Sequence, residues 1–465
     1  MIDLKALRDD PERFRRGASD KGTDGRIVDD LLACDKRLRA ALTEREQLGA
    51  EKNRIGKQIG ALAGRISKAE AGQRPALETE MRQLRQRPSE IKQRELELTQ
   101  QVKDLQADRD ELWLRLPQPA NATVPVGQSE QDNVELRRWN PAWFDPDLPF
   151  HQNKGFSPRS HIDLGLDLGL VSFDRGVKMA GTRSYVLTRA GMLLHQAVLR
   201  LAFDFMIYEN GFTPVSVPVL VREQMMFGTA FFPHAKDECY EIAETQRGGG
   251  HDLYLTGTGE VGLMGYRADE ILDPEVELPA CYTTLSTCFR REAGASGKDT
   301  AGLYRIHQFD KVEQVVLCRA DPQESGRWHE KMIGFVEALL QRLELPYRLL
   351  QVCTTDMGQA KADQVDVDCW MPSRGDPGPG GQPAGAYGET HSASQLHDYQ
   401  TRRLNIRYRD PDTKKNVFCY SLNNTVVASP RILIPILELY QNDDGSVTVP
   451  QALRQYMNGA EVIGH

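Results

Sequence analysis

The chain has 465 residues, of which 27% are charged and 40% hydrophobic, and a formal net charge of -8. This length predicts two domains, the composition is that of a soluble globular protein, and the charge excludes a surface that is basic throughout. The N-terminus MIDLKALRDDPERF is charged from its third residue, and no run of eighteen apolar residues occurs. We therefore expect neither a signal peptide nor a membrane span. Eight scattered cysteines without a C-x-x-C pair predict reduced thiols in a cytoplasmic protein.

The first predicted element is a long helical hairpin. Residues 28–70 contain no proline, and their apolar residues repeat at heptad spacing, as in a coiled coil. A turn is expected near residues 70–77. A second helix then returns with an apolar residue at every seventh position, namely Leu77, Leu84, Ile91, Leu98, Leu105 and Leu112. Pro88 lies inside this helix and predicts a kink, because proline lacks the N–H donor.

The distal half of this hairpin is basic. Residues 52–94 hold eleven Lys or Arg against four Glu, a local charge of +7, and no aromatic residue. Such an arm suits a polyanion that is bound through its backbone and shape rather than by base stacking. The alternative is an ordinary solvated coiled-coil surface, and the charge pattern by itself leaves both interpretations open.

A second domain is predicted after the linker LPQPANATVP, which divides the chain into 1–117 and 118–465. Residues 185–212 predict a long amphipathic helix that ends at an Asn-Gly pair. The proline-containing segment 213–221 predicts an edge strand. Further strands are expected at 284–289, 309–318 and 402–410, and a buried helix at 431–441 despite Pro435. This order predicts an α+β fold with an antiparallel sheet and flanking helices.

The stretch FRREAGASGKDTAGLYRIHQFDKVE, residues 289–313, places opposed charges around a glycine-bearing loop. Neither a P-loop nor a dinucleotide fingerprint occurs in the chain. A phosphate site would therefore be built from side chains, and arginine suits it because its planar fork meets two phosphate oxygens. Arg290, Arg291 and Arg305 are candidates from this stretch, and Arg431 is a distant one.

Several long motifs resemble the class II aminoacyl-tRNA synthetases. The stretch above looks like their motif 2, SLNNTVVASPRILIPILELYQ like motif 3, and GFTPVSVPVLV like motif 1. The N-terminal hairpin, YLTGTGE, ETHSASQLHDYQTRRLNIRYR and the ending DGSVTVPQALRQYM resemble the seryl-tRNA synthetases. The resemblance covers almost the whole chain. It implies an ATP-dependent ligase that forms seryl-adenylate and transfers serine to the 3′ end of a serine tRNA, with selenocysteine tRNA as an additional candidate.

The resemblance also implies site residues, a metal and an assembly. Arg290 and Arg431 are the expected catalytic residues, with Arg290 at the α-phosphate and Arg431 and Phe309 around the adenine. The expected ATP contacts are Arg290, Arg291, Glu292, Arg305, Ile306, His307, Gln308, Phe309, Glu389, Thr390, His391, Ser392 and Arg431. Glu389 and Ser392 are the expected Mg²⁺ residues, and no zinc is expected. The expected serine contacts are Thr258, Gly259, Glu260, Glu313 and Thr425. The arm would hold tRNA, and the chain would form a homodimer partly through motif 1.

Some positions depart from the family pattern. Gly257 and Gly259 stand where bulkier residues are usual, which predicts a looser serine loop, and Gln395 stands where asparagine is usual. Residues 373–388 form a Pro/Gly-rich insertion, interpreted as a tolerated surface loop or a lid. The competing functions are a paralogue that delivers serine to a carrier protein or small molecule, a non-catalytic binding protein that keeps the fold, and a coiled-coil scaffold.

Overall fold

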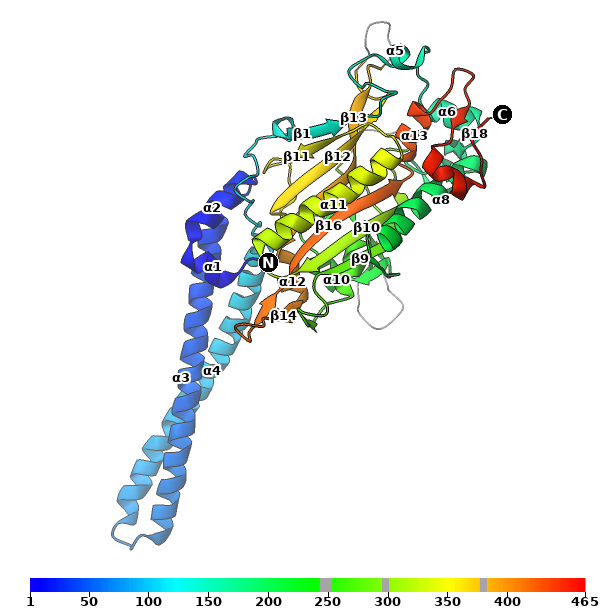
Figure 1. Cartoon of the computed structure of the whole chain (residues 1–465). Helices are drawn as coiled ribbons and strands as arrows, with labels where there is room; N and C mark the ends of the chain where they lie inside the picture. The colour runs from blue at the N-terminus through cyan, green and yellow to red at the C-terminus, as the bar shows by residue number, and fades with distance from the viewer. Residues whose placement is uncertain (243–252, 295–300, 377–382, 465) are drawn as a thin grey trace. The chain divides into compact units, whose positions relative to one another are not determined.

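The computed structural model describes residues 1–242, 253–294, 301–376 and 383–464. Residues 295–300, which belong to the charged stretch 289–313 (the charged loop below), and residues 377–382 of the predicted insertion lie outside the described residues. Two compact units are formed: one comprises Asp3–Ser19 and Thr23–Leu116, and the other comprises Met1–Ile2, Asp20–Gly22 and Pro117–His465. Figure 1 shows the helices of the first unit in blue and the sheet-containing second unit in cyan to red.

The first unit is the predicted helical hairpin. Short helices α1 (Leu4–Asp9) and α2 (Pro11–Asp20) precede α3 (Arg26–Lys68) and α4 (Arg74–Arg115), which lie side by side in Figure 1. Their seam is apolar because the heptad positions face each other, and its buried residues are Cys34, Leu38, Ala41, Leu98, Val102 and Leu105. α4 continues through Pro88 as a single helix. The predicted hairpin is confirmed.

The second unit is built on a largely antiparallel sheet. In the described part of the chain its strands lie in the order β1 (Val134–Trp139), β11 (Tyr347–Gln351), β12 (Asp363–Met371), β13 (Ala386–His397), β16 (Tyr420–Ser429), β10 (Gln308–Cys318), β9 (Ala280–Phe289) and β4 (Thr213–Pro214). Among these pairings, β4 runs parallel to β9 and the others are antiparallel. The predicted α+β class is confirmed, and the proline-containing segment starts with the edge strand, as expected.

Helices cover this sheet and create the main core. Figure 1 shows α11 (Pro322–Arg342) lying over the sheet in nearly the same direction as β12 and β16, and α8 (Arg189–Asp204) and α13 (Leu433–Leu439) also pack on the sheet. Every residue of α13 is buried. Pro435 is tolerated there because it occupies the first turn, where its missing N–H would have had no partner within the helix.

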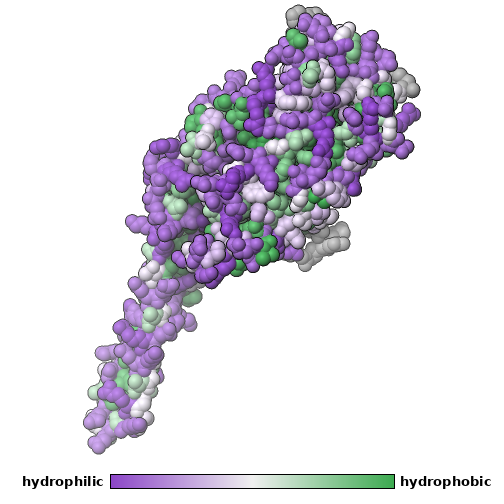
Figure 2. Space-filling model, in the orientation of Figure 1, coloured by the Kyte–Doolittle hydropathy of each residue, from purple (hydrophilic) through white to green (hydrophobic). Residues whose placement is uncertain are grey.

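One described segment, Arg189–Glu209, is long and apolar enough to cross a membrane. It consists of α8 and the π-helical turn η2 (Phe205–Glu209). Its apolar side chains, including Leu194, Val198 and Leu201, belong to the main core. We therefore assign it as a core helix. Figure 2 shows that hydrophilic residues predominate on the visible surface.

One predicted strand is partly wrong. Residues 402–404 complete helix α12 (Tyr399–Leu404), and only β14 (Arg407–Arg409) is extended. The helix forms because Tyr399 and Leu404 are buried on its inner face, and it ends where Asn405 adopts a left-handed φ of 55°. This tertiary burial outweighs the local strand pattern.

The remaining elements surround the sheet and shape its ends. They are η1 (Glu130–Asp132), α5 (Phe150–Lys154), α6 (His161–Asp167), β2 (Val171–Ser172), α7 (Phe173–Ala180), β3 (Val186–Leu187), β5 (Leu220–Arg222), α9 (Glu223–Gly228), η3 (Lys236–Glu238), β6 (Tyr240–Ile242), β7 (Leu253–Leu255), α10 (Glu260–Gly265), β8 (Ile271–Leu272), β15 (Asn416–Phe418), β17 (Val447–Thr448), η4 (Gln451–Met457) and β18 (Val462–Ile463).

Candidate active site

A cavity of about 340 Å³ opens on the sheet and collects most of the predicted site residues. Side chains of β10, β13 and β16 form much of its wall, and segments around α10 and α13 complete it. The predicted residues on this wall are Thr258, Glu260, Arg290, Glu292, Ile306, Phe309, Glu313, Glu389, Thr390, His391, Ser392, Thr425 and Arg431. Segments that are far apart in the sequence thus converge on one space.

Five predicted residues lie beside this cavity rather than on its wall. Arg305 lines an adjoining cavity together with Arg290 and Glu292, and it pairs with Glu292 at 3.3 Å. His307 contributes its backbone carbonyl to the Arg290 N–H at 2.9 Å. The others are Arg291, Gln308, which pairs with Phe289 across β9 and β10, and Gly259.

The Arg290 side chain contacts one backbone carbonyl and an aromatic ring, and the Arg431 side chain contacts two backbone carbonyls and an aromatic ring. The Arg290 guanidinium lies 5.3 Å from the centre of the Phe309 ring, and its Nε donates to the Gly257 carbonyl at 3.4 Å. The Arg431 guanidinium lies 4.5 Å from the centre of the Tyr304 ring. Tyr304 lines the cavity and was missed by the sequence analysis, which assigned a role to every neighbour from Arg305 to Phe309.

Thr258, Lys311 and Glu313 form a buried polar cluster at another part of the wall. Lys311 pairs with Glu313, and its Nζ donates to Thr258 Oγ1 at 2.8 Å. Thr258 Oγ1 in turn donates to Glu313 Oε2 at 3.2 Å. Lys311 was not predicted as a site residue. Its position two residues before Glu313 on a strand was the available signal, since side chains at i and i+2 share a face.

Glu260 is a buried carboxylate at the start of α10. Its Oε1 accepts hydrogen bonds from Gln400 Nε2 and Asn423 Nδ2, both at 2.7 Å. Burial raises the pKa of Glu260 to about 7, although the Gln400 hydrogen bond acts in the opposite direction. A carboxyl group of this kind changes charge near neutral pH and is stabilised as an anion by a bound cation.

Gly259 is required by packing. A Cβ atom at this position would lie 2.4 Å from Thr284 Cγ2 and 2.9 Å from Ser286 Oγ. At Gly257 the closest atoms would be 3.4 Å away, which is an ordinary contact. The loop is thus closely packed at Gly259, and the looseness expected there from the sequence is not observed.

An acidic group lies across β12 and β13. Asp366 is paired with Ser392 across the strands, and burial followed by the negative charge of Glu389 raises the pKa of Asp366 to about 7. Ser392 Oγ is buried beside the Asp366 carboxyl, and its hydrogen bond lowers the Asp366 pKa against these two effects. Within those residues no group of three or more His, Cys, Asp and Glu is arranged to hold a metal.

A loop that the sequence analysis missed, residues 358–361, also lines the cavity. Its backbone is held by the buried Lys21, whose Nζ donates to the carbonyl of Gly358 at 3.0 Å, of Gln359 at 3.4 Å and of Lys361 at close range. Desolvation lowers the pKa of Lys361 itself. No sequence pattern pointed to a contact between residues more than 330 positions apart.

Comparisons with known proteins agree with this geometry. Residues 240–440 match the tRNA synthetase class II core domain (G, H, P, S and T), and residues 1–117 match the seryl-tRNA synthetase N-terminal domain. The serine–tRNA ligase of Deinococcus radiodurans is 39% identical over 100% of this chain and 99% of its own length.

Solved structures extend the comparison to three dimensions. The seryl-tRNA synthetase of Pyrococcus horikoshii, crystallised with ATP, has a TM-score of 0.85 and 37% identity over 100% of this chain and 99% of its own. The cytoplasmic serine–tRNA ligase of Naegleria fowleri, in complex with AMP, has a TM-score of 0.77 and 30% identity over 97% and 95% of the two chains.

The sheet, the converging arginines and the core-domain match define a class II aminoacyl-tRNA synthetase. The full-length identity of 37–39% to serine–tRNA ligases and the matched N-terminal domain identify the family within this class. The chain belongs to the seryl-tRNA synthetase family, the serine–tRNA ligases.

Proposed function

We propose that this chain activates L-serine with ATP and transfers the seryl group to the 3′ end of a serine tRNA, using the cavity described above. The observation that carries the proposal is the convergence of Arg290, Arg431, Glu260 and Glu313 on one wall. The relative from Pyrococcus horikoshii, which was crystallised with ATP and is similar over the full chain, supports a nucleotide in this space.

The two chemical steps need no protein nucleophile. A serine carboxylate oxygen attacks the α-phosphorus, the bond between that phosphorus and the bridging oxygen breaks, and pyrophosphate leaves. A ribose hydroxyl of the tRNA then attacks the seryl carbonyl, and AMP leaves. Holding the reactants in attack geometry lowers such a barrier by roughly 7–11 kcal/mol. Arg290 and Arg431 are the proposed catalytic residues, because fixed guanidinium groups neutralise charge that moves during phosphoryl substitution.

The proposed ATP contacts are those expected from the sequence. Glu292, Ile306, Phe309, Thr390 and His391 are supported by their positions on the cavity wall. Arg305 is supported by its contact with Glu292 and by the adjoining cavity. Arg291, His307 and Gln308 would act through the backbone that fixes Arg290 and Phe309.

The residues around Glu389 fit a Mg²⁺ ion. Magnesium in nucleotide sites takes one or two carboxylates and the substrate phosphates, and it keeps several waters. Glu389 and Ser392 line the cavity, and the Asp366 carboxyl lies beside Ser392 on the neighbouring strand. A bound ion would supply positive charge to the phosphates. The chain's own residues would orient it, and the charge of Asp366 would add to that of Glu389.

The proposed serine pocket is made of Thr258, Gly259, Glu260, Glu313 and Thr425. Glu260 is available to pair with the substrate ammonium, and the Thr258–Glu313 cluster offers hydrogen-bonding groups to its hydroxyl. A pocket that hydrogen-bonds a hydroxyl rejects the analogue lacking it by roughly 10⁴–10⁵. This discrimination would exclude alanine.

The arm, the dimer and the cellular location complete the proposal. Residues 1–117 would form the tRNA-holding domain and 118–465 the catalytic domain, with the basic residues of 52–94 contacting the tRNA backbone. A homodimer would use the edge strand β4 and its neighbours, and light scattering tests it. The Naegleria relative supports a cytoplasmic location.

Serine-dependent ATP–pyrophosphate exchange, followed by charging of purified serine tRNA, tests the function. Both activities are expected, and charging should weaken with rising salt far more than exchange does. A variant with Arg65, Arg82 and Arg85 changed to Glu should lose charging and keep exchange. Exchange without charging in the unchanged chain would favour the paralogue that serves another acceptor, and absence of exchange would contradict the proposal.

A further inference from the structure

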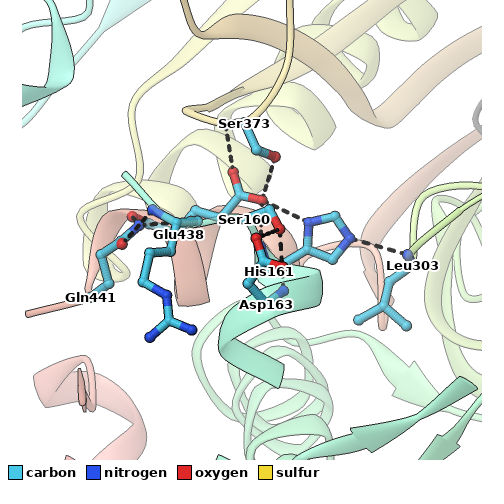
Figure 3. A network of polar contacts seen from close by, with 8 residues as sticks. Ser160, His161, Asp163, Leu303, Ser373, Glu438 and Gln441 are labelled. Atoms are coloured by element: carbon cyan, nitrogen blue, oxygen red, sulfur yellow. Dashed lines mark hydrogen bonds and ion pairs between the residues drawn. The ribbon is translucent and has the colours of Figure 1, made fainter. Parts of the chain in front are cut away.

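A buried network joins three segments next to the cavity, and Figure 3 shows it around Glu438. The Glu438 side chain of α13 is fully buried. Its Oε1 faces His161 Nδ1 at 2.6 Å and accepts from the His161 backbone N–H at 2.9 Å. Ser373, the first residue of the insertion, donates from its backbone N–H to Oε2 at 2.9 Å and from its hydroxyl to Oε1 at 2.5 Å.

The other ring nitrogen of His161, Nε2, contacts the backbone of the charged loop. His161 Nε2 accepts the backbone N–H of Leu303 at 3.3 Å, as Figure 3 shows. A backbone N–H can only donate, so Nε2 is the acceptor and the ring proton lies on Nδ1, facing Glu438. The carboxylate of Glu438 thus sets the tautomer that allows the ring to hold Leu303.

The approach of this backbone to the ring is close. Gly302 has a φ of 80°, and a Cβ atom there would lie 2.4 Å from His161 Nε2. The turn before Leu303 therefore needs glycine both for its backbone conformation and for space. His161 and Gly302 are matched parts of one contact.

Leu303 is followed by the residue that fixes Arg431. The Tyr304 carbonyl accepts Arg431 Nε at 3.1 Å, and the Tyr304 hydroxyl donates to the Glu389 carbonyl at 3.2 Å. Arg374, next to Ser373, places its guanidinium 3.9 Å from the centre of the same ring. Any displacement of Leu303 therefore moves the support of Arg431 and of Glu389.

We propose that His161, held by Glu438, is a positioning residue for the nucleotide: it fixes the segment Leu303–Tyr304 and through it Arg431. This inference rests on the proposed binding of ATP by Arg431. The role concerns the nucleotide and not serine, because the network lies on the Tyr304 side of the site, whereas Thr258 and Glu260 are held by Lys311, Gln400 and Asn423. The insertion is tied to the same network through Ser373 rather than being an independent surface loop at its start.

The test measures the KM for ATP and the KM for serine separately in pyrophosphate exchange. His161→Asn keeps a donor near the Nδ1 position but cannot reach Leu303, whereas His161→Gln places an acceptor near the Nε2 position. His161→Asn is expected to raise the KM for ATP roughly 5- to 20-fold, the size expected for a lost buried hydrogen bond and its unpaired donor. The KM for serine should stay within about twofold, and His161→Gln should recover part of the loss.

His329→Asn is the matched control, because His329 is also buried but lies on α11 and is not on the cavity wall. The proposal is overturned if His161→Asn raises the KM for ATP no more than His329→Asn does, or if it raises the KM for ATP and the KM for serine together. Gly302→Ala probes the same contact from the loop side and should also raise the KM for ATP. Loss of folding in both His161→Asn and Gly302→Ala would show a purely structural role and reject the proposal. Absence of exchange in the unchanged chain would instead reject the proposed function.

Discussion

Replacement of Glu260 by Gln tests the buried carboxylate in the proposed serine pocket. Burial raises its pKa from 4.5 to about 7. Between these pH values the native state keeps a proton that the unfolded state has lost, so the stability of the native state falls as pH rises. The shift corresponds to about 3 kcal/mol once pH exceeds 7. Glu260→Gln removes this cost and keeps an acceptor for Gln400 and Asn423.

The free energy of unfolding, measured by urea titration, should therefore be similar for the variant and the unchanged chain at pH 5. At pH 8 the variant should be more stable by up to about 3 kcal/mol. The variant should also lose serine activation, since its amide cannot neutralise the substrate ammonium. In the unchanged chain the KM for serine should rise about tenfold per pH unit below 7, as the carboxylate becomes protonated.

Glu330→Gln on the exposed face of α11 is the control for removal of a negative charge. It should alter neither the pH dependence of unfolding nor the KM for serine. A stability difference between Glu260→Gln and the unchanged chain that stays constant from pH 5 to 8 would refute the reasoning about burial. Retained serine activation in Glu260→Gln would refute its proposed role.

Three further predictions concern packing. Gly259→Ala should raise the KM for serine at least about tenfold, because its Cβ would lie 2.4 Å from Thr284 Cγ2. Gly257→Ala should change the same KM less than about threefold, because the nearest atom to its Cβ would be 3.4 Å away. Equal effects of the two variants in exchange assays would contradict this reasoning. Lys21→Met removes three hydrogen bonds to carbonyls of the cavity loop, of which those of Gly358 and Gln359 keep a backbone N–H partner. It should lower stability by about 1–3 kcal/mol and also lower the kcat of exchange, and a normal kcat would separate the loop from catalysis. Leu98→Ala in the seam should destabilise the arm by about 3 kcal/mol, seen as faster proteolysis within residues 26–115, and leave exchange intact.

The elements with strong periodicity were predictable from the sequence. The hairpin followed from heptads whose burial needs only the partner helix, and strands β9 and β10 followed from short apolar runs between turns. Helix α12 was misread because the burial of Tyr399 and Leu404 depends on distant segments. Local patterns cannot report such tertiary contacts.

The candidate site was predictable in its arginines and carboxylates, because these residues sit in long motifs. The residues that hold these side chains and the cavity loop in place were not predictable. Lys21, Lys311, Gln400 and Tyr304 act through distances that only the folded chain sets, and Lys21 reaches backbone carbonyls, which have no sequence signature. The burial that raises the pKa of Glu260 likewise depends on neighbours from several elements.

Arg431 is anchored by the main-chain carbonyls of Tyr304 and Glu389, at 3.1 Å each. Since every amino acid carries a carbonyl, no point substitution at either anchor can delete these two bonds. Single substitutions at 304 or 389 would therefore be a poor route to resistance against a competitive inhibitor that binds the Arg431 guanidinium. Resistance would have to arise at Arg431 itself or through a shift of the surrounding backbone.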